Sequence, residues 1–267
     1  MYPPTLREIT IEMSNLYSTQ TKDQQLYLSM EEVLTFYGIL TPLGTALFQE
    51  DTWPLDSDVH NESISDAMQR NRFDEIMASL HVVDNTKITD DPFFKVRPIF
   101  SELNQSYKVM PFQEWLSVDE SMIRYYGRHG CKQFIRGKPI RFGYKLWSLA
   151  SSSGYMHHME PYGGSHTLLP ETGLGQEPSV VLGLAEQAQM PQGCKFIHDN
   201  LFTSLGFLDE MTKRRCGSSG TMRQNRLFDV PFKPQKEFMK LSRGTSEVKT
   251  QGDKLLHIEC FKMYHGQ

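Results

Sequence analysis

The spacing of apolar residues changes after Pro111, and this change constrains the fold more than any other feature of the sequence. Before Pro111 the apolar residues recur at helical spacing, whereas after it short β-type runs alternate with turn residues. The chain has 267 residues, 39% hydrophobic and 22% charged, which suits a folded chain with a core and excludes a disordered or coiled-coil one. We therefore predict a helical region over residues 1–110 and an α/β region over residues 111–267.

Three helices are expected in the first region. Residues 29–32 (Ser-Met-Glu-Glu) match a capping box, and Pro42 and Gly44 are stop signals for the helix that follows. Asn71 is expected to cap a second helix with its apolar face on residues 73–80, and residues 96–103 outline a third. The first hundred residues are also rich in acids, so this region is predicted to be helical and acidic.

The second region is predicted to begin with three strands, of which the last two form a hairpin. These are followed by a helix, a strand and a helix capped by Thr203 or Ser204. The expected ranges are 115–123, 144–150, 155–162, 179–188, 194–199 and 205–213. This order is typical of an α/β layout in which the last strand lies parallel to the first.

Charge is distributed unevenly, although the net charge is only −4. No acid occurs between Ser121 and Trp147 or between Met211 and Phe228. Aromatic residues are interleaved with the bases of the first window, which favours a phosphate-binding surface over an ordinary solvated face. The candidate DNA-binding residues are Arg124, Arg128, Lys132, Arg136, Lys138, Arg141, Lys145, Arg223 and Arg226.

The four cysteines lie far apart, without the spacing of a zinc site or a disulfide framework. No apolar run approaches the ~18 residues of a membrane-spanning helix, and no signal peptide is recognisable at the N-terminus. We therefore expect an intracellular protein with free thiols, no zinc and no membrane partner.

Two aspartates occupy comparable positions in the predicted layout. Asp119 lies on the first strand, and Asp199 lies at the carboxyl end of the fourth. If those strands are neighbours, their spacing of ~4.8 Å brings both carboxylates to one edge of the sheet, where they could share Mg²⁺. Phosphoryl-transfer nucleases use such sites, although an Asp-Asn pair after a strand is also a common turn or helix cap.

Eight motifs, in order along the chain, carry a family resemblance. They are residues 66–73, 80–85, 94–98, 118–123, 132–139, 142–147, 199–204 and 220–226. Together they resemble the piggyBac transposase family, and more closely its domesticated, transposable element-derived members. The resemblance extends from about Leu6 to about Gly244.

The resemblance implies an RNase H-like core preceded by a helical region for dimerisation and DNA binding. It also implies cut-and-paste chemistry at TTAA targets, with three metal-binding aspartates. Asp119 and Asp199 match the first two, but no Trp-x-Asp-Asn motif for the third follows Arg243-Gly244. We therefore expect an incomplete RNase H-like sheet, weak Mg²⁺ binding by Asp119 and Asp199, and no transposition by this chain alone, since the metal clamp is incomplete.

Three functions follow as hypotheses. The first is a catalytically inactive, transposase-derived protein in the nucleus that binds the phosphates of DNA. It is expected to form homodimers and to have no small-molecule substrate. The second is a protein-interaction module that dimerises through residues 1–110 and does not use DNA. The third is an active metal-dependent transposase or nuclease.

Overall fold

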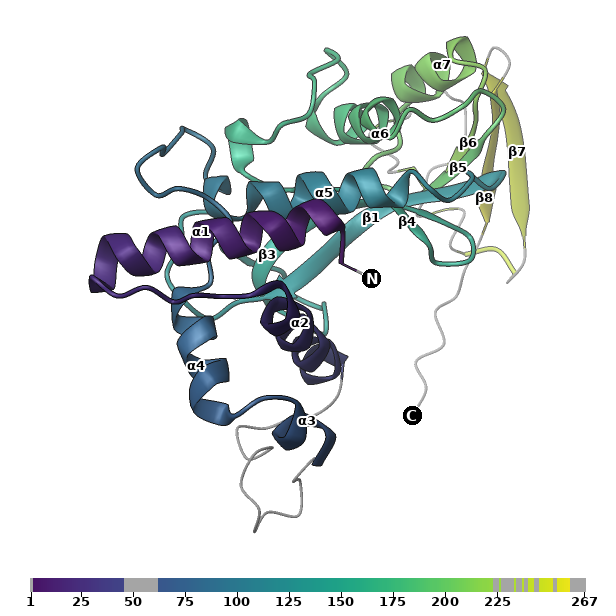
Figure 1. The fold of residues 1–267 in the computed structure, drawn as a ribbon. Helices are drawn as coiled ribbons and strands as arrows, with labels where there is room; N and C mark the ends of the chain where they lie inside the picture. Colours follow the sequence, from purple (N-terminus) through teal and green to yellow (C-terminus); the bar gives the residue numbers. More distant parts are fainter. Residues whose placement is uncertain are drawn as a thin grey trace. The chain divides into compact units, whose positions relative to one another are not determined.

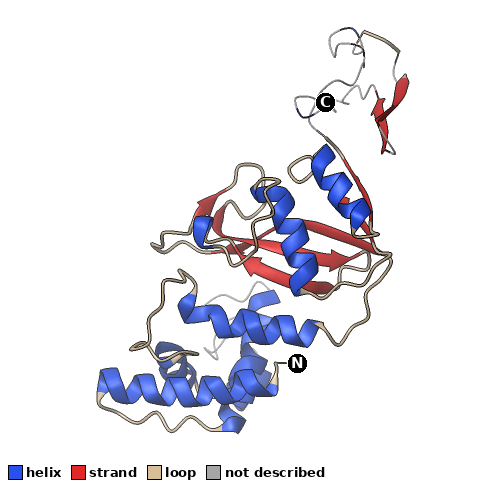
Figure 2. Cartoon of the chain, turned by 90° about the horizontal axis from the view of Figure 1, so that it is seen from above, coloured by secondary structure: helices blue, strands red, loops and turns tan. Residues whose placement is uncertain are grey.

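The computed structural model describes residues 2–45, 62–222, 226, 233, 237, 240–242, 245–251 and 254–259. The chain forms two compact units, and strand β1 (Trp115–Arg124) contributes residues to both. The first unit contains residues 1–111, 120–150 and 154–169, and the second contains residues 112–119, 151–153 and 170–267. Figure 1 labels the elements along the sequence, and Figure 2 separates helices from strands by colour. The domain boundary predicted after residue 110 stays a prediction.

In the described part of the first unit, helices α1 to α4 pack around one apolar cluster. The helices of this unit are α1 (Pro4–Lys22), α2 (Met30–Thr45), α3 (Glu62–Ala67), α4 (Arg70–Ser79) and α5 (Arg97–Tyr107), with a 3₁₀ turn at Phe94–Val96 before α5. The cluster includes Val33 and Phe36 of α2 and Ile76 of α4, all fully buried. Arg72 of α4 donates from Nε to Oε1 of Glu32 at 2.7 Å, which ties α4 to the start of α2.

The capping box is confirmed, but two other helix signals are wrong. The Ser29 amide donates to Glu32 Oε2 at 3.0 Å, and the Glu32 amide donates to Ser29 Oγ at 3.2 Å. Pro42 does not end α2, which continues to Thr45, one residue past the second stop signal, Gly44. A proline removes one amide donor but does not by itself end a helix. The Asn71 cap is wrong because α4 already begins at Arg70, which places Asn71 inside the first turn.

The strands form a mixed sheet in the order β2-β3-β1-β5-β6, with β4 paired to β3. Strand β1 pairs parallel to β5, and β5 pairs parallel to β6, whereas β3 pairs antiparallel to β2 and β4. Besides β1, these strands are β2 (Gln133–Phe134), β3 (Phe142–Ser151), β4 (Met156–Pro161), β5 (Lys195–His198) and β6 (Gly217–Gly220). The predicted hairpin and the predicted parallel strand are therefore both confirmed.

The second unit contains α6 (Gln176–Gln187) and α7 (Leu205–Lys213), together with an antiparallel ribbon of β7 (Ser246–Gln251) and β8 (Lys254–Glu259). Ser204 is the cap of α7, because its Oγ accepts from the Phe207 amide at 3.2 Å. Residues 178–185 of α6 are all buried, which explains why this helix is apolar on every side.

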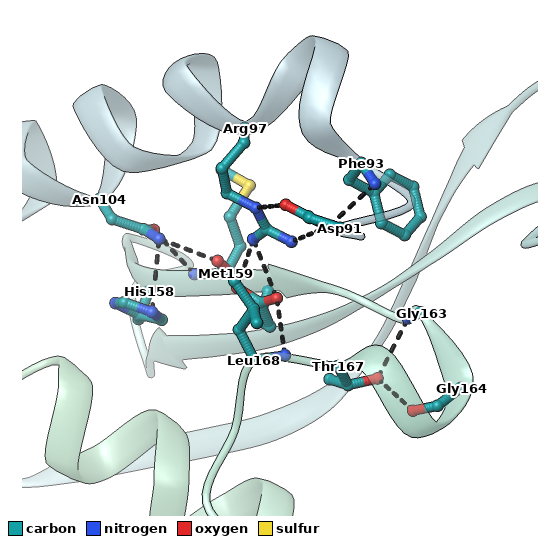
Figure 3. A network of polar contacts seen from close by, with 11 residues as sticks. Asp91, Phe93, Arg97, Asn104, His158, Met159, Gly163, Gly164, Thr167 and Leu168 are labelled. Carbon is teal, nitrogen blue, oxygen red and sulfur yellow. Dashed lines mark hydrogen bonds and ion pairs between the residues drawn. The ribbon is translucent and has the colours of Figure 1, made fainter. Parts of the chain in front are cut away.

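An ionic network around buried Glu160 in the first unit fixes α5 against β4 (Figure 3). Arg97 donates from Nε to Asp91 at 2.6 Å and from Nη1 to Glu160 at 2.9 Å. Burial raises the pKa of Glu160, and the Arg97 guanidinium opposes that rise. Asn104 of α5 exchanges two hydrogen bonds of 2.9 Å with the backbone of Met159. Such buried charges are tolerated because each has a partner.

Candidate functional site

The parallel pairing of β1 with β5 places Asp119 and Asp199 at matching positions in the second unit. The paired register runs from Trp115 opposite Lys195 to Ser117 opposite Ile197, and each aspartate lies two residues beyond that last pair. Exposure alternates along both strands, and both aspartates are exposed, as are Ser117 and Ile197. Asp119 lies inside β1 and Asp199 directly follows β5, so the parallel register and the strand spacing of ~4.8 Å place the two residues side by side.

The Asp199 side chain forms a turn, as one of the two interpretations of the Asp-Asn pair predicts, while its role as a metal ligand stays a prediction. The Leu201 amide donates to Asp199 Oδ1 at 2.7 Å, which closes an Asx-turn. The Thr203 hydroxyl donates to the Asp199 carbonyl oxygen at 2.8 Å. The turn over residues 199–203, here called the Asp199 turn, thus limits where the carboxylate can lie.

His198 supports the Asp199 turn from the buried side of β5. Its Nδ1 lies 2.8 Å from Thr203 Oγ1, and its Nε2 lies 2.7 Å from Ser218 Oγ of β6. The single hydroxyl hydrogen of Thr203 is given to Asp199, so His198 Nδ1 carries a proton and donates to Thr203. Nε2 of the neutral ring then accepts from Ser218. Burial lowers the pKa of His198, although Asp199 opposes this, and the neutral form is favoured.

Gly220 permits β6 to lie close to His198 of β5. A Cβ atom at Gly220 would overlap the His198 imidazole and carbonyl oxygen. The glycine of the 220–226 motif is therefore required for packing, because any larger residue at this position would displace His198.

Arg226 holds the Asp199 turn from a separate segment. Its Nη1 donates to the carbonyl oxygens of Asn200 at 3.2 Å, Leu201 at 2.8 Å and Thr203 at 2.9 Å. The sequence predicts Arg226 as a DNA contact and does not reveal this role, because hydrogen bonds to backbone carbonyls leave no signal in a charge pattern. Arg223, its predicted neighbour in DNA binding, lies outside the described residues.

The first basic window forms a hairpin in the first unit. Phe134 of β2 faces Phe142 of β3 with ring centroids 4.8 Å apart, and the Ile135 amide donates to the Arg141 carbonyl oxygen at 2.9 Å. Gly137 in the connecting turn has a φ of +94°, which favours glycine. Arg136 and Arg141 are exposed on this turn, which we call the basic hairpin (residues 133–143).

Among the remaining bases of the window, the arginines are exposed, whereas the lysines contact carbonyl oxygens or an aromatic ring. Arg124 and Arg128 are exposed, and within the part of the chain that the structure describes neither they nor Arg136 and Arg141 form an ion pair. The three lysines are half-buried and bonded. Lys132 Nζ donates to the Gly127 carbonyl oxygen at 2.9 Å, Lys138 Nζ donates to the Glu120 carbonyl oxygen at 3.1 Å, and Lys145 Nζ lies 3.9 Å from the Trp147 ring centroid.

The donor chemistry at Asp119 and Asp199 fits a hard divalent cation. Mg²⁺ is commonly bound by one or two carboxylates and completes its coordination with water or phosphate oxygens. Among the residues that the structure describes, no group of three or more His, Cys, Asp or Glu side chains could hold a metal ion. The pair thus suits Mg²⁺ in number and type of ligand but provides only two protein side chains. Bound there, Mg²⁺ would supply electrostatic stabilisation of phosphoryl transfer.

Comparison with known proteins identifies the family. The family model described as transposase IS4 matches residues 2–267. The human piggyBac transposable element-derived protein 3 is 38% identical over 251 residues, which cover 92% of this chain and 42% of that protein. This chain belongs to the piggyBac transposase family. The human piggyBac transposable element-derived protein 2 is 34% identical over 247 residues, covering 90% of this chain and 41% of that protein.

The fold is that of a piggyBac transposase. A solved structure described as a piggyBac transposase synaptic complex with hairpin DNA matches with a TM-score of 0.78 at 20% identity, covering 100% of this chain and 60% of that one. The predicted mixed α/β, RNase H-like class is thereby confirmed. This member of the piggyBac family spans about two fifths of the length of the two human relatives. In the described residues no helix has both the length and the apolarity to cross a bilayer.

The first prediction concerns pH. A histidine with a lowered folded-state pKa contributes stability above its ordinary value of 6.5, and that stability is lost as pH falls through the folded-state pKa. We expect His198→Asn to weaken the acid sensitivity of unfolding as pH falls below 6.5. Urea unfolding at several pH values measures this, with His166→Asn at an exposed histidine as control. Equal pH dependence in wild type and His198→Asn would contradict the assignment.

The second prediction concerns Arg226. Its three bonds to carbonyl oxygens should restrain the Asp199 turn, so Arg226→Ala should speed amide hydrogen exchange in residues 200–203 and cost about 1–3 kcal/mol of unfolding free energy. Arg226→Lys should restore part of both, because one ammonium can still donate. Arg215→Ala removes the same charge without touching the turn carbonyls and serves as control. Unchanged exchange in Arg226→Ala would refute the role.

Proposed function

We propose that this chain is a transposase-derived protein that binds DNA through phosphate contacts and does not by itself cut or join DNA. The observation that carries the proposal is the basic hairpin, which presents exposed arginines beside exposed Phe134 and Phe142. Arginine with interleaved aromatic residues is the composition of a surface that follows a nucleic-acid backbone. Membership of a transposase family supports the same partner, as does the description of the matched structure as a complex with hairpin DNA.

Contacts of this kind are expected to tolerate changes of DNA sequence. Arg124 and Arg128 extend the exposed cations beyond the basic hairpin, within the same unit. Guanidinium groups that meet phosphate oxygens fix the position of a duplex without reading its bases. Each phosphate neutralised releases counterions, so affinity should fall steeply with salt. A DNA partner of this kind would place the protein in the nucleus, and a homodimer would double the number of phosphate contacts.

The proposed inactivity rests on the metal ligands. Two-metal phosphoryl transfer needs both ions held in fixed positions, and Asp119 and Asp199 contribute one carboxylate each. We propose that these two residues bind Mg²⁺ weakly and that this chain alone therefore lacks the charge stabilisation that phosphoryl transfer requires. The two aspartates would then be retained ligands of a site whose remaining groups are not among the described residues.

The third prediction tests DNA binding. Fluorescence anisotropy of a labelled duplex of arbitrary sequence should show binding at low salt whose affinity falls by orders of magnitude between about 50 and 200 mM salt. Arg136→Ala combined with Arg141→Ala should weaken binding and reduce the salt slope by roughly one unit per lost phosphate contact. Arg70→Ala with Lys87→Ala removes two exposed cations elsewhere and is the matched control.

Two results would overturn the proposed DNA binding, and a third would overturn the proposed inactivity. If wild type does not bind duplex at low salt, or if the hairpin variant binds as tightly as the control variant, the basic hairpin does not contact DNA. If purified protein nicks or joins DNA in Mg²⁺ or Mn²⁺ and Asp119→Ala abolishes this, the proposed inactivity is wrong.

A further inference from the structure

The first unit contains a cavity of about 690 Å³ that the proposed phosphate contacts do not use. It lies between the segment 88–100, which leads into α5, and the segment 123–144, which runs from the end of β1 into β3. Its volume falls within the range of roughly 300–1,000 Å³ that small-molecule sites occupy. The cavity therefore has room for one planar group and part of what is attached to it.

Aromatic rings form one wall of the cavity. Tyr125 and Tyr144 are stacked with centroids 4.7 Å apart, and Phe93 meets Tyr144 edge-on at 5.5 Å. His129 also lies edge-on to Tyr144, at 5.2 Å. Because these rings already pack on one another, the wall is formed before any ligand arrives.

Hydrogen bonds hold the aromatic wall in place. The Cys131 amide donates to His129 Nδ1 at 3.2 Å, so His129 is the Nε2–H tautomer and donates to the Pro92 carbonyl oxygen at 3.2 Å. This bond joins the two segments that line the cavity. Burial, together with its hydrogen bond to Tyr125, raises the pKa of Tyr144 to about 12, so its hydroxyl stays protonated at neutral pH.

The charges around the cavity favour an anionic ligand. Lys95 lines it and is exposed, while Arg124 and Arg128 are exposed on the segment that carries Tyr125 and His129. The acid in the lining, Asp91, receives two hydrogen bonds from Arg97, at 2.6 and 3.0 Å, so its charge is compensated. Asp90 is exposed next to it but does not line the cavity.

We propose that this cavity receives one unpaired nucleobase of a bound DNA, with the attached phosphates on Lys95, Arg124 and Arg128. The inference rests on the proposed DNA-binding function. Aromatic walls stack any base because every base has a π-face. Lys95 in the lining, with Arg124 and Arg128 on the segment that carries Tyr125 and His129, supplies cations for the backbone on either side of that base. A base inside a paired stack cannot reach such a pocket, and the cost of extruding it is least where it is already unpaired.

The fourth prediction compares two DNA molecules that differ at a single position. One is a duplex with a single-base bulge of 2-aminopurine, and the other is the same duplex with that base paired. We expect wild type to bind the bulged duplex about tenfold more tightly, the value of one base–aromatic stack, and to quench the 2-aminopurine fluorescence. Tyr125→Leu should lose the preference and the quenching while keeping its affinity for the paired duplex.

Two further variants make the result specific to the cavity. Val96→Trp adds a ring to the lining without removing an aromatic contact, so it should abolish the preference by filling the space even if Tyr125→Leu is poorly folded. Tyr126→Leu changes a neighbouring tyrosine that is 74% exposed and does not line the cavity, so it should keep the preference.

The outcomes separate this inference from the proposed function. Equal affinity for the two duplexes, or a preference that survives Val96→Trp, refutes the nucleobase pocket and leaves phosphate binding standing. Absence of binding to either duplex at low salt refutes both. A cavity that instead binds an apolar peptide side chain would leave the bulge preference absent, which also overturns the proposal.

Discussion

The parallel pairing of β1 with β5 is the interaction on which the candidate metal site depends. Because the register is continuous from Trp115 opposite Lys195 to Ser117 opposite Ile197, Asp119 inside β1 and Asp199 directly after β5 come to matching positions. A shift of one residue would turn one aspartate to the buried face, since successive side chains in a strand alternate. The apolar residues that enforce the register are Leu116, Val118 and Phe196, all buried.

Next to the Asp199 turn, buried His198 forms part of a polar network. His198 and Phe196 are both buried on the same side of β5. Both ring nitrogens of His198 have hydroxyl partners, so its burial leaves neither nitrogen without a hydrogen bond. Together with Arg226 on the turn carbonyls, this network holds the Asp199 turn from two sides. A carboxylate held in this way loses less conformational entropy when it binds a cation than one on a mobile loop.

Sequence patterns predicted those parts of the fold that depend on local hydrogen bonds or on strong apolar runs. The capping box at Ser29, the Ser204 cap and strands β1, β3, β4 and β5 are of this kind. Strand β6 was not predicted, because Gly-Ser-Ser-Gly carries no apolar alternation and is a strand only through its pairing with β5. The roles of Arg226 and of the engaged lysines were not predicted either, because a charge pattern does not show which cations meet carbonyl oxygens or aromatic rings.

We propose that Asp119 and Asp199 bind one divalent ion together. Mn²⁺ titration followed by electron paramagnetic resonance tests it, with Asp119→Asn, Asp199→Asn, the double variant and Asp66→Asn as an exposed control. A shared ion predicts that either single substitution removes the same bound Mn²⁺ and that the double variant loses nothing more, because coupled residues are not additive. A shared ion is ruled out if each single variant keeps a bound Mn²⁺ ion of its own, or if wild type binds Mn²⁺ no better than the double variant.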